Sequence, residues 1–206
     1  MTIEDFHDPV PGQSDIFDEI VDRDPPRVLG LDLAAECSGV ALPDGSTTTI
    51  TAPRASGSPR TLADNLDRMD FVTGAVEELL EEHRPRLVVL EDYAPGAKGA
   101  SAHRLAEVGG CVRLACYRAR AALVLVGTRQ AKLYATGKGT AQKSDMRLAL
   151  YKRAGLEVPT EDEVDAWWLR AMGRDRLGSP VAVVPASHRR VLENITWPEL
   201  ALGGAT

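Results

Sequence analysis

Apolar positions along the chain follow two different periods, and the shorter one marks strands. Val28–Leu33 and Gly39–Leu42 are short apolar runs separated by small residues, which predicts two antiparallel strands joined by a tight turn. Ser46–Ala52 is rich in β-branched residues and predicts a third strand. Arg86–Glu91 and Ala121–Val126 are continuous apolar runs, which indicates strands covered on both faces. The chain therefore opens with a hairpin and continues with buried strands.

The longer period marks helices. Apolar residues recur at helical spacing, or the composition favours a helix, in Thr61–His83, Ala102–Ala119, Gln142–Ala154 and Thr160–Met172. Thr160 and Glu163 open the last of these with the spacing of a capping box. Between the second and third lies Tyr134–Thr140, which is rich in Gly and Lys and is read as a loop. Three strands followed by helix, strand, helix, strand and helices predict a mixed α/β domain.

Composition divides the chain into three parts. Residues 1–27 hold eight acids and two bases, which accounts for the whole net charge of -6. With four prolines and few large apolar groups, they are expected to form an acidic, flexible N-terminal extension, either a solubilising tail or a mask for a basic surface. Residues 28–173 are expected to form the main domain. Residues 174–206 are weakly periodic and predict a C-terminal appendage or dimer element.

The remainder of the chain is neutral overall but unevenly charged. Residues 94–153 hold twelve Lys and Arg against two acids, whereas the other carboxylates cluster elsewhere. A basic segment beside a group of acids is typical of proteins that bind phosphates and hold metal ions.

Several classes of protein are excluded by the same composition. No apolar run approaches the length of a membrane span and the acidic N-terminus is unlike a signal peptide, so a soluble, cytoplasmic protein is expected. Three cysteines at Cys37, Cys111 and Cys116 support neither a disulfide framework nor a zinc site.

Four acids occupy positions where a fold seldom places them. Asp32 lies inside the first apolar run, Glu91 ends the fourth strand, and Asp162 and Asp165 share one face of the last helix. Burying a lone carboxylate is costly unless it is paired or bound to a metal. If the four converge, their mutual repulsion requires cations, and two Mg²⁺ or Mn²⁺ ions are the arrangement found in nucleases.

Each acid also has a simpler interpretation. Asp162 could complement the helix dipole while Asp165 lies on a solvated face, and Glu91 could be a charge in a strand-end turn. Asp32 is the hardest to explain in this way, because its neighbours on both sides are apolar.

A family resemblance is carried by five segments in order. VLGLDLAAECSGVAL resembles the first hairpin of RuvC-type Holliday junction resolvases, which belong to the RNase H-like nucleases, and LVVLEDY resembles their strand with the second acid. HRLAEVGGCVRLAC is similar to the next helix, YATGKGTAQKSDM to the basic loop and helix start, and DEVDAWWL to the terminal D-x-x-D-A pattern.

The resemblance implies an RNase H-like mixed five-stranded sheet flanked by helices, with a nuclease domain over residues 28–173. It implies a magnesium-dependent crossover junction endodeoxyribonuclease. Such an enzyme is a homodimer that nicks two like strands of four-way DNA symmetrically. Any motor that drives branch migration would be a separate protein. The protein would act in the cytoplasm of a bacterial cell or, if the gene comes from a phage, in the cytoplasm of the host. Metal ligands are implied at Asp32, Glu91, Asp162 and Asp165.

The same resemblance places basic residues at the DNA. Lys143 is implied as a catalytic residue near the scissile phosphate, and the expected DNA-binding set is Tyr93, Lys98, Arg104, Lys138 and Lys143. Two features depart from the family pattern: Asp92 follows the second acid, and Tyr93 precedes the usual position of the stacking aromatic residue. Asp92 could therefore share the metal ions.

Three other functions compete with junction resolution. A nuclease of this fold could act on other branched DNA or on RNA, and a DNA-structure-binding protein could keep a vestigial metal site. An ATPase of the actin-like superfamily would need further glycine-rich phosphate loops, and Gly137–Gly139 lacks a P-loop pattern.

Overall fold

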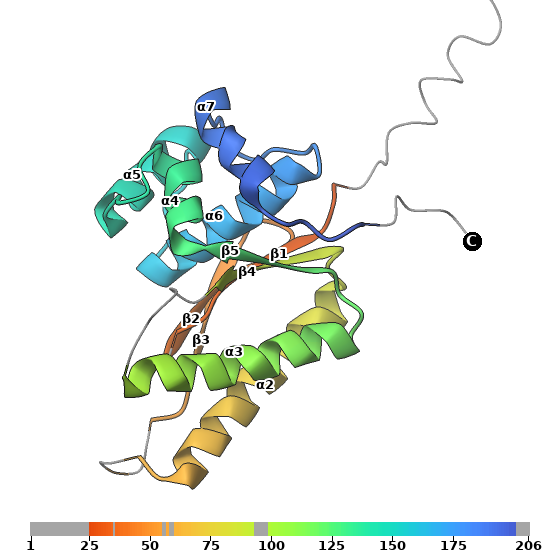
Figure 1. Ribbon diagram of the computed structural model, residues 1–206, viewed down its shortest axis with the longest axis vertical. Coiled ribbons are helices and arrows are strands. Elements are labelled where there is room, and N and C mark those ends of the chain that lie inside the picture. The colour runs from red at the N-terminus through yellow and green to blue at the C-terminus, as the bar shows by residue number, and fades with distance from the viewer. Residues whose placement is uncertain (1–24, 35, 55–56, 58–59, 93–98, 201–206) are drawn as a thin grey trace, which may run out of the picture.

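The computed structural model describes residues 25–34, 36–54, 57, 60–92 and 99–200. A five-stranded sheet lies between two layers of helices (Figure 1), with α2 and α3 on one face and α4, α5, α6 and α7 on the other. The predicted mixed α/β sheet flanked by helices is therefore confirmed. No helix in the described part of the chain has the length and apolar character needed to cross a membrane.

The first three strands form the predicted antiparallel meander. β1 (Val28–Asp32) pairs with β2 (Cys37–Ala41), and β2 pairs with β3 (Thr47–Thr51). In this register Asp32 lies opposite Gly39. A small-residue turn thus places the last residue of β1 beside the start of β2.

The other two strands run parallel to β1. β4 (Leu87–Asp92) pairs with β1 and β5 (Leu123–Gly127) pairs with β4, which gives the order β3-β2-β1-β4-β5. β4 is buried over its first four residues, as predicted. β5 alternates between buried and half-buried residues, so the prediction of full burial was wrong for this strand. The reason is its place at the edge of the sheet, which no single apolar run reveals.

The four predicted helices are present to within a few residues, and residues 128–136 and 186–194 form helical segments that were not predicted. The layer below the sheet in Figure 1 consists of α2 (Leu62–His83) and α3 (Ala100–Arg118). The other layer consists of α4 (Thr128–Thr136), α5 (Lys143–Ala154), α6 (Glu161–Arg176), α7 (Ala186–Arg189) and the 3₁₀ helix η1 (Arg190–Asn194).

Two corrections concern this second layer. Residues 134–136 belong to α4 rather than to a loop, and the loop begins at Gly137, which ends the helix in the left-handed conformation (φ 82°). α6 continues to Arg176, so the expected boundary between residues 173 and 174 falls inside a helix. Val191, Leu192 and Ile195 then pack into the same core as the helix.

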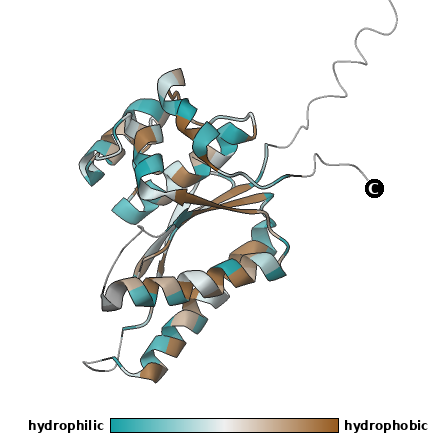
Figure 2. Ribbon diagram, viewed as in Figure 1, coloured by the Kyte–Doolittle hydropathy of each residue, from teal (hydrophilic) through white to brown (hydrophobic). Residues whose placement is uncertain are grey.

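Alternate residues of β1, β2, β4 and β5 enter two separate cores. Leu29 and Leu31 of β1 face α2 and α3, whereas Val28 faces the α6 layer. β1, β4 and β5 are mostly apolar, and α2 and α3 carry apolar residues among polar ones (Figure 2). Trp167 and Trp168 fill the α6 side, with ring centroids 5.2 Å apart. Because side chains alternate along a strand, the position of Asp32 decides which face it serves.

Candidate active site

The site is built on one row of residues across the sheet. Asp32 ends β1, and the parallel register that pairs Leu31 with Leu90 sets Asp32 beside Glu91 on β4. Gly39 of β2 lies opposite Asp32 on the other side. Residues in one row point to the same face. Asp32 and Glu91 are therefore directed to the α6 face, and Asp32 is 8% exposed.

Two glycines allow α6 to lie directly on this row. A Cβ atom at Gly39 would be 2.0 Å from the backbone oxygen of Asp162, and one at Gly30 would be 2.2 Å from that of Ala166. Such distances exclude any side chain at these positions unless the helix moves. Glycine at both positions therefore brings the first turns of α6, with Asp162 and Asp165, over the end of β1.

The charges of all four predicted acids meet at Asp32. Burial, a hydrogen bond and charge from Glu91, and the charges of Asp165 and Asp162 raise the pKa of Asp32 well above its usual value. Burial and Glu91 also raise the pKa of Asp165, to about 6. The structure therefore brings together acids that lie up to 133 positions apart in the chain.

Lys143 lies at the edge of the acids. Its Nζ atom is 3.2 Å from Oε2 of Glu161 and 3.6 Å from Oδ1 of Asp162, and the side chain is half exposed. Burial lowers the pKa of Lys143, but the hydrogen bond to Glu161 and the charges of Asp162, Asp165 and Glu161 outweigh it and raise the pKa. Lys143 remains a cation beside the carboxylates.

The donor set suits a hard divalent cation. Carboxylate oxygens are the ligands that Mg²⁺ and Mn²⁺ favour. Burial and the charges of Glu91, Asp165 and Asp162 raise the pKa of Asp32, and a bound cation would offset both effects. Among the described residues, no group of three His, Cys, Asp or Glu side chains is arranged closely enough to coordinate one metal ion.

The other predicted residues are more scattered. Lys138 is exposed in the loop after α4, where its backbone N–H donates to Oγ1 of Thr136. Arg104 is half-buried on α3, and its backbone oxygen accepts a hydrogen bond from Arg68. Tyr93 and Lys98 lie outside the described residues.

Asp92 follows Glu91 within β4 and is half-buried. Successive residues of a strand point to opposite faces, so the strand geometry directs Asp92 away from the face that carries Asp32 and Glu91. The acids whose charges raise the pKa of Asp32 are Glu91, Asp165 and Asp162.

Sequence reasoning missed two contributors to the site. Glu161 pairs with Lys143. The positive charge of Lys132 on α4 lowers the pKa of Asp165, although burial and the charge of Glu91 raise it by more.

Glu163 was predicted to be part of a capping box. Thr160 does cap α6, but the Glu163 carboxylate also accepts hydrogen bonds from β3. The acidic D-E-V-D run was the available signal, yet the partners of Glu163 are more than 110 positions away.

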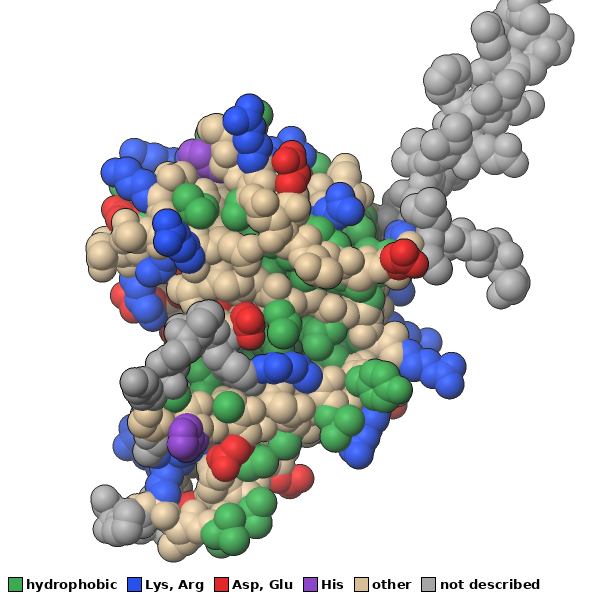
Figure 3. All heavy atoms as spheres, viewed as in Figure 1, with side chains coloured by type: hydrophobic (Ala, Val, Ile, Leu, Met, Phe, Trp, Pro, Cys, Tyr) green, Lys and Arg blue, Asp and Glu red, His purple; other side chains and the backbone are tan. Residues whose placement is uncertain are grey.

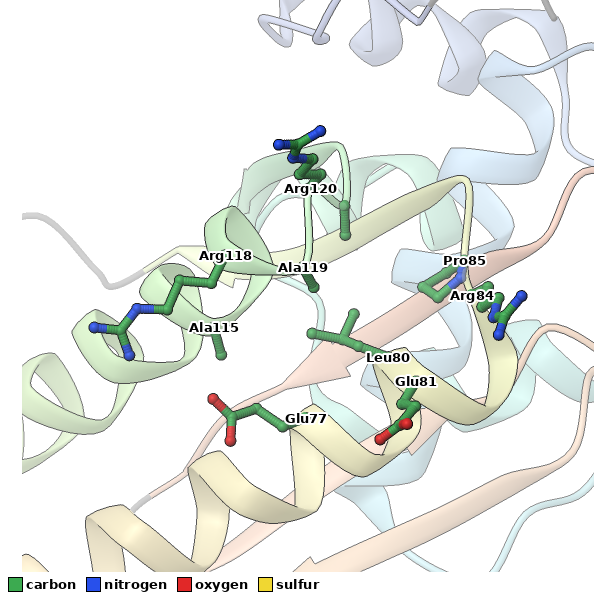
Figure 4. Close-up of a pocket in the computed structure, with 10 residues that line it drawn as sticks. Glu77, Leu80, Glu81, Arg84, Pro85, Ala115, Arg118, Ala119 and Arg120 are labelled. Atoms are coloured by element: carbon green, nitrogen blue, oxygen red, sulfur yellow. The ribbon is translucent and has the colours of Figure 1, made fainter. Parts of the chain in front are cut away.

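A cavity elsewhere marks a different part of the surface. A 460 Å³ cavity lies where the C-terminal ends of α2 and α3 meet the starts of β4 and β5. Figure 4 shows Arg84, Arg118 and Arg120 pointing in different directions around Leu80 and Ala115. Glu91 is at the other end of β4, so this cavity is remote from the carboxylates.

Comparisons with known proteins bear on the same residues. The family model described as crossover junction endodeoxyribonuclease RuvC matches residues 28–165. RuvC of Alkalilimnicola ehrlichii is 30% identical over 145 residues, covering 68% of this chain and 86% of the relative. RuvC of Saccharopolyspora erythraea is 31% identical over 144 residues, covering 68% and 72%.

A solved structure shows the same fold. Thermus thermophilus RuvC in complex with a Holliday junction substrate superposes with a TM-score of 0.59 at 21% identity, covering 77% of this chain and 99% of that one. The matched residues 28–165 include all four acids that meet at Asp32. The chain therefore belongs to the RuvC family of crossover junction endodeoxyribonucleases.

Proposed function

We propose that this protein resolves Holliday junctions, cutting four-way DNA by two symmetric nicks. The convergence of four acids on the end of β1 carries the proposal, since a nuclease needs such a ligand set and a structural protein gains nothing from its repulsion. Family membership implies divalent-metal dependence and action on branched DNA, and the junction-bound Thermus thermophilus relative supports both the substrate and the fold.

The four carboxylates would hold two Mg²⁺ or Mn²⁺ ions per active site. Bound ions of this kind lower the pKa of a water molecule and neutralise charge on a phosphodiester. Asp32 and Glu91 would supply oxygens from the sheet, and Asp162 and Asp165 would supply them from α6. Lys143 would meet the scissile phosphate, because its ammonium group lies at the edge of the acids and carries three N–H donors.

Basic residues beyond the site would follow the DNA backbone. Lys and Arg predominate over the part of the surface formed by α4, α5 and α7 (Figure 3). Lys138, Arg104 and Lys98 belong to the basic segment 94–153, and Tyr93 would stack on a base near the cleavage point.

A homodimer would give two active sites for two nicks. Large apolar side chains that are exposed on α2 and α3 would be available for self-association: Leu62, Leu66, Phe71, Leu114 and Tyr117. Any branch-migration motor would be a separate protein. Light scattering of the purified protein and of a Phe71→Ser variant tests the dimer, which should dissociate more readily in the variant.

The decisive experiment uses a labelled mobile four-way junction and a matched linear duplex, each with Mg²⁺, Mn²⁺ or EDTA. Paired nicks in the junction alone, lost with EDTA, are expected. Equal cutting of the duplex or of RNA would indicate a nuclease with another substrate. Tight junction binding without cutting would indicate a DNA-structure-binding protein.

A further inference from the structure

The stripe of α6 that faces the sheet contains two charged residues. Glu163, Ala166, Arg170 and Gly173 recur at three- and four-residue spacing, and they form the side of the helix that lies on β1 and β2. Glu163 is 4% exposed and Arg170 is 3% exposed. Burying an ionised group costs free energy unless it is fully paired. A purely apolar stripe would attach the helix at less cost.

Glu163 is bonded to the edge strand of the sheet. Its carboxylate accepts hydrogen bonds from the hydroxyl groups of Thr47 and Thr49, the latter at 2.9 Å. These residues are two positions apart on β3 and therefore share a face. Oγ1 of Thr160, the residue that caps α6, is 3.2 Å from the same carboxylate. Three hydroxyl groups thus fix one buried carboxylate.

Arg170 is bonded to the turn of the same hairpin. Its guanidinium donates to the backbone oxygen of Pro43 at 2.8 Å, in the turn between β2 and β3. It also covers Gly45, whose left-handed conformation (φ 103°) shapes that turn. Glu163 and Arg170 lie two helical turns apart on α6, so the helix is attached at two points along one hairpin.

The hydrogen bonds of Glu163 and Arg170 fix the position of α6 more closely than apolar packing would. Apolar side chains tolerate small slides and rotations of a helix, whereas hydrogen bonds weaken steeply when their geometry changes. Glu163 immediately follows Asp162 and lies two residues before Asp165. A rotation of α6 that carried either acid away from Asp32 would break the bonds to Thr47 and Thr49.

We propose that Glu163 and Arg170 are positioning residues that fix the register of α6 on the β2–β3 hairpin and thereby hold Asp162 and Asp165 beside Asp32. The inference rests on the proposed function in one respect: these carboxylates bind the metal ions. Glu163 acts through its neighbours, because its own oxygens are occupied by the threonine hydroxyl groups.

The test compares variants by Mn²⁺ titration calorimetry on the full chain without DNA. Glu163→Ala removes the carboxylate, and the Thr47→Val/Thr49→Val pair removes the donors from β3. Losing an outer-shell partner weakens metal binding by about 10- to 100-fold, and each variant should show a loss in this range. Combining the two should add little, because both break the same contact. Glu157→Ala removes an exposed acid just before α6 and should leave Mn²⁺ affinity unchanged.

A further variant separates positioning from stability. Glu163→Met with Thr47→Val and Thr49→Val replaces the polar contact with β3 by apolar groups, which restores stability in many buried ion and hydrogen-bond pairs. The melting temperature should return to the wild-type value while Mn²⁺ affinity stays reduced about 10-fold or more. In junction cleavage, kcat at a fixed Mn²⁺ concentration should fall with KM for DNA unchanged.

Wild-type Mn²⁺ affinity in the apolar variant would overturn the inference and leave Glu163 a stabilising residue only. Additive losses in the combined variant would also overturn it. If the wild-type protein binds Mn²⁺ but cuts no DNA, the proposed function fails while the calorimetric comparison still decides the role of Glu163. If the wild-type protein binds no Mn²⁺, the metal assignment and this inference fail together.

Discussion

The two helical layers are attached to the same sheet in different ways. α6 lies so close to β1 and β2 that a side chain at Gly30 or Gly39 would collide with the helix backbone. Glu163 and Arg170 of α6 also bond to the β2–β3 hairpin. α2 contacts the sheet through apolar residues such as Val72 and Val76. Its buried Arg68 donates hydrogen bonds to Asn65 and to the backbone oxygen of Arg104, which joins α2 to α3.

This difference follows from what each layer carries. Metal ligands must be held to within a fraction of an ångström, which directional bonds and close backbone contact achieve. Non-directional apolar packing suffices for a layer whose task is to cover the sheet and to present apolar residues at its surface. The four predictions below test this contrast, from the largest expected effect to the smallest.

Asp32→Asn should abolish cleavage while sparing junction binding. The asparagine removes a metal ligand, so the loss should exceed the ~10- to 100-fold typical of an outer-shell partner. It also removes a buried carboxylate that repels its neighbours, so the melting temperature should not fall. Nicking assays, electrophoretic binding assays and thermal melting measure the three effects. Loss of binding together with cleavage would contradict a purely catalytic role for Asp32.

Gly39→Ala, under α6, and Gly74→Ala, in α2, should change the free energy of unfolding in opposite directions. The new methyl group at Gly39 collides with the Asp162 backbone, which should cost about 1–3 kcal/mol of stability and displace the ligands on α6. Gly74 lies inside α2 with open space at its Cβ position, so alanine should stabilise the protein by up to ~1 kcal/mol. Urea unfolding measures both. Equal effects at the two positions would refute the contrast.

Arg189→Ala tests whether α7 belongs to the tightly attached layer. Arg189 pairs with Asp175, whose side chain is fully buried and also accepts a hydrogen bond from Tyr134 at 2.8 Å. Leaving Asp175 with one partner should cost about 1–3 kcal/mol in urea unfolding. Arg190→Ala, at the neighbouring exposed position, should change stability by less than ~0.5 kcal/mol. Similarly small losses of stability in both variants would show that the Arg189–Asp175 pair does not hold α7 tightly to this layer.

Asp165→Asn should change how stability depends on pH. Burial and Glu91 raise the pKa of Asp165 to about 6, so the folded state favours its protonated form. Without metal, the wild-type protein should lose stability relative to the variant as pH rises from about 4 through about 6, by on the order of 1–2 kcal/mol. Cleavage should weaken as the pH falls, because protonation of Asp165 competes with metal binding.

Unfolding measured across this pH range, with and without Mn²⁺, provides the check. Added Mn²⁺ should stabilise the wild-type protein above pH 6 more than it stabilises the variant. Asp70→Asn, exposed on α2, is the matched control and should leave the pH profile unchanged. A profile in Asp165→Asn that matches the wild type would show that Asp165 does not titrate near pH 6.

Local pattern accounts for most of the elements. Thr61 caps α2 and Gly155 ends α5 in the left-handed conformation, as the residue types indicate. α4 was missed because its nine residues include a stretch that composition marks as a loop, and packing of Ala131 and Tyr134 into the core outweighs that local signal. Leu62 and Leu66 fit the apolar stripe of α2 but are exposed, since the first turns of the helix project beyond the sheet (Figure 1).

The sequence by itself determined the alternation of strands and helices, the anomalous carboxylate at Asp32 and the family. Each depends on neighbouring residues or on motifs read in order. Only the tertiary structure decided that Asp32 and Glu91 share a row, that Gly39 lets Asp162 reach it, and that Glu163 bonds to β3. These contacts join residues far apart in the chain, and their existence depends on strand register and helix placement, which local preferences do not specify.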